Sequence, residues 1–304
     1  MEALILSLTS SFVRFYISRK DRKRDRGLVT PENIERFDNI QYGEDDSFNL
    51  LDIYRPKQHE CEKFPVIINF HGGAWVYSTK DTYQFYCMEL AQMGFAVVNF
   101  SYRLAPESKF PANIEDCCNA VRWVQQNADR YLLDLKNVFA VADSAGCHIA
   151  GLFLAACTDG EYAKGIGVEP PENFKINAIA FNCGCYRLLR HGEKSRHIAV
   201  RNLIKDLLPE NGSEKEERYL NVTDHVNENF PPAYIMSCTD DFMLYQHELL
   251  LEAYKMLGLP YFVKIYKDID GKKLYHIFHV DIRNSNSRIC NSEECDFFKK
   301  YMRK

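Results

Sequence analysis

The sequence predicts an α/β protein with a mostly parallel central sheet and helices on both of its faces. Short apolar runs rich in β-branched residues alternate with longer segments of helical spacing along most of the 304 residues. This alternation is typical of parallel strands joined by helices, because each crossover helix covers one face of the sheet. A hydrophobic content of 46% provides enough apolar material for a sizeable core.

The first half of the chain contains an amino-terminal helix, three strands and two further helices. Residues 3–17 are apolar-rich, with Leu4, Leu8, Phe12 and Phe15 at roughly helical spacing. Apolar runs that are continuous or alternate with polar residues predict strands at 48–54, 66–70 and 95–102. Longer periodic segments predict helices at 82–93 and 114–128.

The second half continues the alternation, with one interruption. Apolar runs predict strands at 138–142, 176–183, 233–238 and 261–266, and periodic segments predict helices at 145–157, 247–257 and 293–302. The polar stretch 186–230 falls between two of these strands, and Pro209 and a turn at 211–213 divide it into two helix-like pieces. We expect an excursion over one sheet edge, either a lid or a passive surface insertion.

Charge and cysteine content limit the partners and the compartment. The 38 basic and 42 acidic residues give a net charge of −4, which provides no global attraction for nucleic acid or an anionic membrane. The 11 cysteines are odd in number and scattered without metal-ligand spacing, so we expect free thiols in a cytoplasmic protein. No uncharged run reaches 18 residues, which argues against a transmembrane segment.

The amino-terminal segment allows two interpretations. Residues 19–26 contain six basic and two acidic residues directly after the apolar part. Glu2 stands where a signal peptide would carry positive charge, so we do not expect secretion. The segment is either a helix that packs on its own domain or an amphipathic helix at a membrane surface.

A candidate nucleophile lies where a strand passes directly into a helix. Residues 138–146 read VFAVADSAG, so Ser144 stands between small residues at a sharp strand-to-helix turn. Ala142 occupies a position where glycine is usual in this motif. The alternative interpretation is a serine that only caps the helix.

A glycine pair follows another predicted strand. Residues 66–75 read VIINFHGGAW, and paired glycines allow backbone N–H groups to approach a ligand without a Cβ in the way. We therefore expect Gly72, Gly73 and Ala145 to donate to an oxyanion. A glycine-rich turn or a phosphate site is the alternative, but the chain lacks the G-x-G-x-x-G spacing there.

Four motifs in a fixed order carry a family resemblance. HGGAW at 71–75, YRLAPE at 102–107, FPA at 110–112 and ADSAG at 142–146 resemble the hormone-sensitive-lipase-like branch of the α/β-hydrolase esterases. The resemblance implies one α/β-hydrolase domain over 1–304, with a helical cap from about 1–40 and about 186–230. It also implies that Arg103, Glu107 and Asp116 hold loops around the site.

The resemblance further implies an acid and a histidine after the serine. Counting from the paired prolines at 231–232 places the acid at Asp241, with Asp240 as the alternative. His276 matches the family histidine after the last strand, with His279 as the alternative. Ser144 would attack, His276 would transfer the proton, and Asp241 would orient the imidazole.

These residues predict a serine carboxylesterase acting on short-chain acyl esters of small molecules, without a cofactor or metal. Deacetylation of sugars or xylan fragments and feruloyl-type hydrolysis use the same machinery and stay open. A membrane-associated lipase and a non-catalytic receptor are less favoured, and self-association is left open. In the cap, aromatic residues are expected to line an apolar pocket: Trp75, Tyr77, Phe12, Phe15 and Tyr16.

Overall fold

A computed structural model describes residues 8–57, 63–188, 198–210, 213–268 and 273–304. Within these ranges one eight-stranded sheet has the order β1-β2-β4-β3-β5-β6-β7-β8. The strands are β1 (Ile34–Gln41), β2 (Leu50–Pro56), β3 (Phe64–Phe70), β4 (Ala96–Phe100), β5 (Leu133–Asp143), β6 (Ala178–Asn182), β7 (Ala233–Cys238) and β8 (Tyr261–Tyr266). Strand β2 is antiparallel to β1 and β4, and the pairs from β4 to β8 are parallel.

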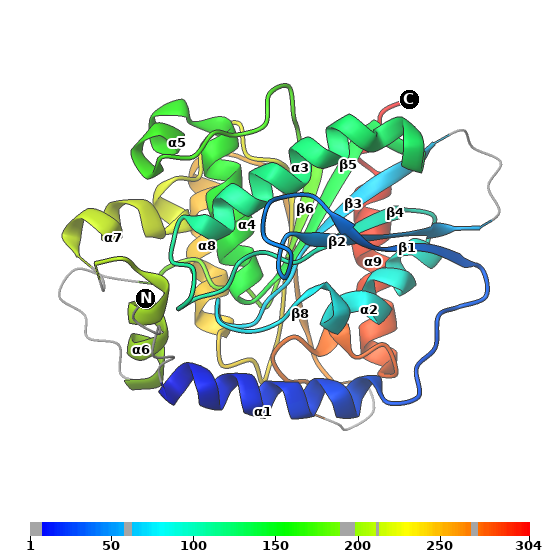
Figure 1. The fold of residues 1–304 in the computed structure, drawn as a ribbon, viewed down its shortest axis with the longest axis horizontal. Coiled ribbons are helices and arrows are strands. Elements are labelled where there is room, and N and C mark those ends of the chain that lie inside the picture. Colours follow the sequence, from blue (N-terminus) through cyan, green and yellow to red (C-terminus); the bar gives the residue numbers. More distant parts are fainter. Residues whose placement is uncertain (1–7, 58–62, 189–197, 211–212, 269–272) are drawn as a thin grey trace.

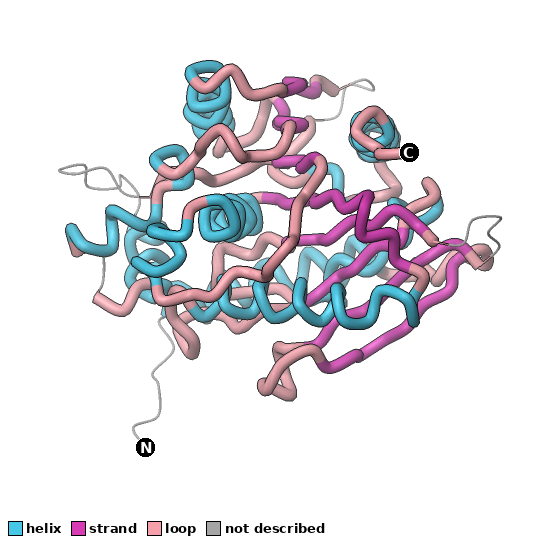
Figure 2. Tube along the Cα trace, turned by 90° about the horizontal axis from the view of Figure 1, so that it is seen from above, coloured by secondary structure: helices cyan, strands magenta, loops and turns pink. Residues whose placement is uncertain are grey.

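Helices cover both faces of the sheet (Figure 2). They are α1 (Leu8–Asp25), α2 (Lys80–Gln92), α3 (Ala112–Tyr131), α4 (Ala145–Thr158), α5 (Gly160–Ile166), α6 (Ile198–Leu207), α7 (Glu214–Leu220), α8 (Leu244–Met256) and α9 (Ser285–Lys299), with 3₁₀ turns η1 (Val222–Asp224) and η2 (Phe278–Val280). Helices α3, α4 and α8 pack into one hydrophobic cluster, and α2 and α9 pack into the other. The predicted α/β fold class is confirmed.

Alternation of side chains along the buried strands supplies both clusters. In β3, Val66 and Ile68 belong to the cluster with α3 and α4, whereas Ile67 belongs to the cluster with α2 and α9. Successive residues of a strand point to opposite faces, so a strand covered on both sides must be apolar throughout. All three side chains are almost fully buried, which explains why the continuous apolar runs predicted these strands.

Several elements differ from the sequence prediction, and α1 and β5 extend beyond the predicted segments 3–17 and 138–142. Strand β1 is missed because its IERFDNIQ sequence is polar and mostly half-buried or exposed at the sheet edge. Helix α5 is missed because it is short, although Asp159 caps it by accepting from Glu161 N and Tyr162 N. Helix α9 begins at Ser285 instead of 293, after Asn284 caps it by accepting from Asn286 N.

Helices α1 and α6 lie together at the side of the molecule opposite α5 (Figure 1). The Ser10 hydroxyl donates to Asp206, and Asn202 Nδ2 donates to Thr9 Oγ1 at 2.9 Å. The two segments expected to form the cap therefore contact each other. Residues 1–7 and the turn expected at 211–212 lie outside the described residues, as does Leu4.

No helix in the described part of the chain is both long and apolar enough to cross a membrane.

Candidate active site

Ser144 occupies a strained turn between β5 and α4. Its φ of 49° and ψ of −120° lie in a region that few non-glycine residues adopt. Ser144 N donates to Asn182 O at the end of β6, at 3.1 Å. A Cβ on Gly146 would lie 2.1 Å from Phe70 O, so only glycine allows α4 to approach β3 this closely. The predicted nucleophile turn is therefore present.

Three predicted side chains form one continuous hydrogen-bonded path. His276 Nε2 lies 2.8 Å from Ser144 Oγ, and His276 Nδ1 lies 2.7 Å from Asp241 Oδ1. The residues come from three loops at the carboxyl ends of β5, β7 and β8, which parallel pairing brings to one edge of the sheet. Ser144 can thus pass its proton to His276 while Asp241 holds the ring.

The structure separates the predicted residues from their alternatives. Asp240 is exposed, and its nearest cationic partner is Lys273 Nζ at 3.9 Å. His279 is buried with its ring edge against Tyr86, at a centroid distance of 5.2 Å, and burial lowers its pKa to about 3. Neither alternative contacts Ser144.

The acid is held as a carboxylate. Burial raises the pKa of Asp241, but the hydrogen bond and charge of His276 outweigh it and set the pKa at about 2. Met243 N donates to Oδ1 at 2.8 Å, and Ser237 Oγ donates to Oδ2 at 2.7 Å. Both oxygens are therefore fixed, and the carboxylate can stabilise a positive charge on the imidazole.

The expectation for Gly72 as an oxyanion donor is wrong. Gly72 N donates to Asp143 Oδ1 at 2.8 Å and to the Tyr83 hydroxyl at 3.0 Å, so its N–H is already used. The carbonyl of Gly73 accepts from Val76 N and Tyr77 N, which closes the turn. Because the N–H of Gly72 points to Asp143, the available donors of this loop begin one residue later.

The backbone N–H groups of Gly73, Ala74 and Ala145 are among those of this region that have no hydrogen-bond partner within the described residues. Gly73 has a φ of +126°, and Ala145 is the first residue of α4, where helix geometry leaves N–H groups without an acceptor. The positive end of the helix dipole favours negative charge at the same place.

Asp143 holds the loop after β3 through hydrogen bonds from Gly72 N and the Tyr83 hydroxyl. It is fully buried, and burial raises its pKa to about 6, while the Tyr83 hydrogen bond lowers it less. The Tyr83 hydroxyl donates to Asp143 Oδ2 at 2.7 Å. The loop after β3 is thus tied to the residue that precedes the nucleophile.

Two of the aromatic residues expected in a pocket instead anchor the loop after β3. Trp75 is buried, and its Nε1 donates to His148 Nδ1 at 3.3 Å. The Tyr77 hydroxyl donates to Asp21 Oδ2 of α1 at 3.0 Å. These contacts leave the loop held between α4 and α1.

The other three aromatic residues do not line a pocket. Phe12, Phe15 and Tyr16 are 66%, 61% and 49% exposed on the outer side of α1. The side of α1 that faces the body combines polar contacts with Val13, which packs against the hydrophobic core. Arg14 donates to Val76 O at 2.6 Å and forms an ion pair with Glu107.

The expected loop-holding contacts are confirmed. Asp116 is buried and accepts from Arg103 N at 2.7 Å and from the Arg103 guanidinium. Glu107 is held by Arg14.

Sequence reasoning missed several residues that build the site. Ser237 donates to Asp241, and Tyr83 donates to Asp143. Gln246 accepts from Tyr186 N and Arg187 N where the chain leaves β6. Phe242 lies over the His276 ring at a centroid distance of 4.5 Å and is 70% exposed. Among these missed residues, only Phe242 could have been singled out from the sequence, because it is an apolar residue directly after the predicted acid Asp241.

One set of side chains could hold a metal. The ligand atoms of Cys183, Asp241 and His276 lie within 4.8 Å of one another. Asp241 and His276 are already hydrogen-bonded to each other, so this set belongs to the same site and is not a separate centre. A surface hollow lined by Thr158, Asp159 and Asn227 contains none of the three triad residues.

The chain is similar to known proteins in sequence and in fold. The model of the BD-FAE family matches residues 51–253, which is more than half of the chain. The chain belongs to the BD-FAE family. This α/β-hydrolase esterase family is related to the hormone-sensitive-lipase-like esterases.

Curated relatives match part of the chain. Esterase LipC of Mycobacterium tuberculosis is 34% identical over 125 residues, which is 40% of this chain and 30% of the relative. Carboxylesterase 20 of Arabidopsis thaliana is 35% identical over 95 residues, 29% of each protein. The match therefore spans less than one third of the length of either relative.

Solved structures match nearly the whole chain. Esterase B of Lactobacillus rhamnosis has a TM-score of 0.88 at 23% identity, covering 97% of both chains. An esterase of Pyrobaculum calidifontis has a TM-score of 0.75 at 21% identity, covering 96% of this chain and 93% of that one. The fold is thus the α/β-hydrolase fold.

Proposed function

We propose that the protein is a serine carboxylesterase of the hormone-sensitive-lipase-like branch, and that it works through an acyl-enzyme. The observation that carries this proposal is the unbroken path from Ser144 Oγ through His276 to Asp241, with distances of 2.8 and 2.7 Å. A non-catalytic receptor has no use for a nucleophile, base and orienting acid in hydrogen-bond contact. Membership of an esterase family supports the same conclusion.

The mechanism uses each group once in each half of the reaction. His276 takes the proton of Ser144 as its oxygen attacks the ester carbonyl carbon. The N–H groups of Gly73, Ala74 and Ala145 stabilise the negative oxygen of the tetrahedral intermediate. His276 then protonates the leaving alcohol, and water repeats the sequence on the acyl-enzyme to release the acid.

We propose that α1 and the segment 186–230 act as a cap that limits the size of the acyl group. The contacts of α1 with α6 and with the loop after β3 support this role. Phe242 is proposed to contact the substrate, because its exposed ring covers the imidazole that must reach the leaving group. The substrate is therefore a short-chain acyl ester of a small molecule.

A reducing compartment such as the cytoplasm is proposed for this chain. The ten described cysteines carry free thiols, and nine of them are buried. Buried thiols behave as small apolar side chains and are stable where disulfides do not form.

Replacing the nucleophile tests the reaction. Ser144→Ala is expected to lose at least about 10³-fold in kcat, because the remaining groups bind but cannot form an acyl-enzyme. The assay is a panel of p-nitrophenyl esters, acetylated xylo-oligosaccharides and hydroxycinnamate esters. Ser47→Ala, on the exposed loop before β2, is the matched control. Retained activity in Ser144→Ala would show that the nucleophile assignment is wrong.

The cap predicts the acyl preference. Among p-nitrophenyl esters from acetate to palmitate, kcat/KM is expected to be highest for the short chains, since a covered site excludes long ones. A maximum at ten or more carbons would contradict the proposed cap while leaving the serine mechanism intact.

A further inference from the structure

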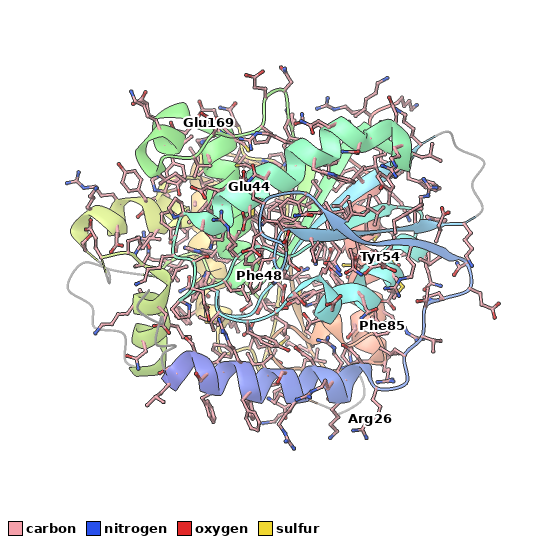
Figure 3. All side chains as sticks on the ribbon, in the orientation of Figure 1. Arg26, Glu44, Phe48, Tyr54, Phe85 and Glu169 are labelled. Atoms are coloured by element: carbon pink, nitrogen blue, oxygen red, sulfur yellow. The ribbon has the colours of Figure 1, made fainter. Side chains whose placement is uncertain are left out.

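Helix α1 presents one continuous outer face that combines apolar and cationic side chains. Leu8, Phe12 and Phe15 are 90%, 66% and 61% exposed, although large apolar residues of a folded chain are usually buried. Figure 3 shows side chains of α1 extending away from the body, with Arg26 just past its end. We name this the outer face of α1, formed by Leu8, Phe12, Phe15, Tyr16, Arg19, Lys20, Arg22, Lys23 and Arg26.

Helix geometry places the eight members that belong to α1 on one side, and Arg26 follows directly after the helix. At about 100° per residue, positions 8 to 23 of the set fall within about 160° of the helix circumference. The apolar members occupy the first half of the helix, and the five basic members occupy the second half. The cations also cover neighbouring rings, with Lys20 Nζ 4.4 Å from the Tyr16 ring centroid.

The outer face contains no acidic residue, because both acids of α1 turn toward the protein. Asp21 accepts from the Tyr77 hydroxyl and pairs with Arg24 at 3.1 Å. Asp25 pairs with Arg24 at 2.7 Å. A chain with a net charge of −4 thus displays here five positive charges that form no ion pair with the described residues, beside four exposed apolar side chains.

The inner side of α1 is already bound to the body, so the outer face is not needed to hold the helix. Arg14 bridges Val76 O, Ala105 O and Glu107. Arg283 donates to the carbonyl of Arg24 at the other end. In the described part of the chain, these side chains of the outer face stay exposed.

We propose that the outer face of α1 docks on an anionic lipid bilayer. Apolar side chains would enter the boundary between headgroups and acyl chains while Lys and Arg contact lipid phosphates and carboxylates. The helix is about 27 Å long and lies flat along one side of the molecule, so all nine side chains can reach a planar surface together. An interfacial helix of this kind binds without crossing the membrane.

A second copy of the chain fits this face less well. A two-fold interface packs the two copies of α1 antiparallel, so over the whole face it would set the basic half of one copy against the apolar half of the other, without acidic partners. A bilayer containing phosphatidylserine supplies the missing negative charge. The observed composition therefore selects the lipid surface as the occupant.

Docking would bring the active site close to the lipid. Arg14 connects α1 to the loop after β3, and that loop carries the proposed oxyanion donors Gly73 and Ala74. Esters that partition to the lipid–water boundary would then be concentrated at the cap. The docking itself requires neither Ser144 nor His276, so it can be tested independently of the proposed esterase activity.

The test is co-sedimentation of the full chain with vesicles. We expect binding to phosphatidylcholine vesicles containing 30% phosphatidylserine, about tenfold or more above binding to pure phosphatidylcholine, and release in high salt. Lys20→Gln with Lys23→Gln is expected to weaken partitioning at least about tenfold, since each removes one surface cation. Phe12→Ser with Phe15→Ser should weaken it similarly by removing the apolar contact.

The controls separate docking from misfolding and from general charge effects. Lys136→Gln with Lys255→Gln makes the same charge change at exposed positions away from α1 and should leave vesicle binding unchanged. All variants should keep the wild-type circular dichroism spectrum and the wild-type rate on p-nitrophenyl acetate. Equal binding to both vesicle types, or equal loss in the control pair, would overturn the proposal. A dimer in light scattering that Phe12→Ser with Phe15→Ser dissociates, without vesicle binding, would also overturn it.

Discussion

Replacing Asp241 by asparagine tests the triad at the contact that the structure defines best. The pKa of Asp241 is lowered from 3.8 to about 2 despite burial, and the main lowering cause is its contact with His276. A lowering of this size corresponds to roughly 2 to 3 kcal/mol, at about 1.36 kcal/mol per pKa unit. Because the Asp241 side chain is fully buried, little of this value is lost to solvent screening.

This energy sets the scale of the effect. Roughly 2 to 3 kcal/mol corresponds to about 30- to 150-fold in rate if the interaction is fully expressed in the transition state. Asparagine also presents an N–H where the carboxylate accepted, which favours the wrong imidazole tautomer, and in the general Ser-His-Asp case this raises the loss to about 10⁴-fold. We therefore expect Asp241→Asn to lower kcat between about 30-fold and 10⁴-fold.

The matched control is Asp240→Asn, which changes the same residue type one position earlier. Asp240 is exposed, accepts a long hydrogen bond from Thr239 and lies 3.9 Å from Lys273 Nζ, so its replacement should change kcat less than about threefold. Initial rates on p-nitrophenyl acetate at pH 7.5 measure both. A loss below tenfold for Asp241→Asn, or an equal loss in both variants, would refute the assignment of the acid.

Two further predictions concern the loop after β3 and the buried acid of α9. Gly73→Ala should lower kcat by about 10²-fold or more, because the added Cβ would lie 2.0 Å from Tyr77 O and displace the oxyanion donors. The control Ala74→Gly keeps its N–H group, so its kcat should stay within a few-fold of the wild-type value. Burial raises the pKa of Glu294 from 4.5 to about 8, against hydrogen bonds from Asn182 and Tyr86. Since its folded-state pKa is the higher one, stability present below about pH 4.5 is lost as pH rises through 8. Urea unfolding should show that the wild type is less stable at pH 9 than at pH 5, by several kcal/mol at about 1.4 kcal/mol per pKa unit. Glu294→Gln should reduce this difference in the free energy of unfolding. An unchanged pH dependence in the variant would contradict a buried neutral acid at this position.

The sequence predicted most of the parallel sheet because a doubly covered strand has a strong signature. Strands β7 and β8 begin and end at the predicted residues, and β3 and β4 are predicted within two residues at each end. Strand β1 could not be found this way. Its side chains are charged and lie at an edge, so pairing with β2, and not burial, holds it in place.

In the candidate site, the sequence identified the catalytic side chains but not the orientation of the backbone N–H groups. Ser144, Asp241 and His276 are identifiable because few residue types perform these steps and their order is fixed. Gly72 was a wrong choice because the direction of a backbone N–H depends on the loop path, and here Asp143 takes it. Composition gives the residues of a loop but not the orientation of its peptide groups.

The amino-terminal helix shows a further limit. Its apolar periodicity predicts two faces, and burial is the usual fate of the apolar one. In the structure Arg14 and Asp21 face inward because carbonyls and hydroxyls of the loop after β3 offer partners, while Phe12 and Phe15 face outward. Which face is covered depends on the partner surface, which no property of the helix sequence records.

The indole of Trp75 connects two parts of the molecule that are distant in sequence. Its N–H reaches His148, whose other ring nitrogen donates to Leu220 O at the end of α7, at 2.7 Å. Trp75 is one of two tryptophans, and Trp123 lies on α3 against Tyr131. In a Trp123→Phe background, tryptophan fluorescence would therefore come from a single indole that belongs to the loop after β3. This indole contacts the end of α7 through His148, so a displacement of α7 from His148 is expected to change its emission.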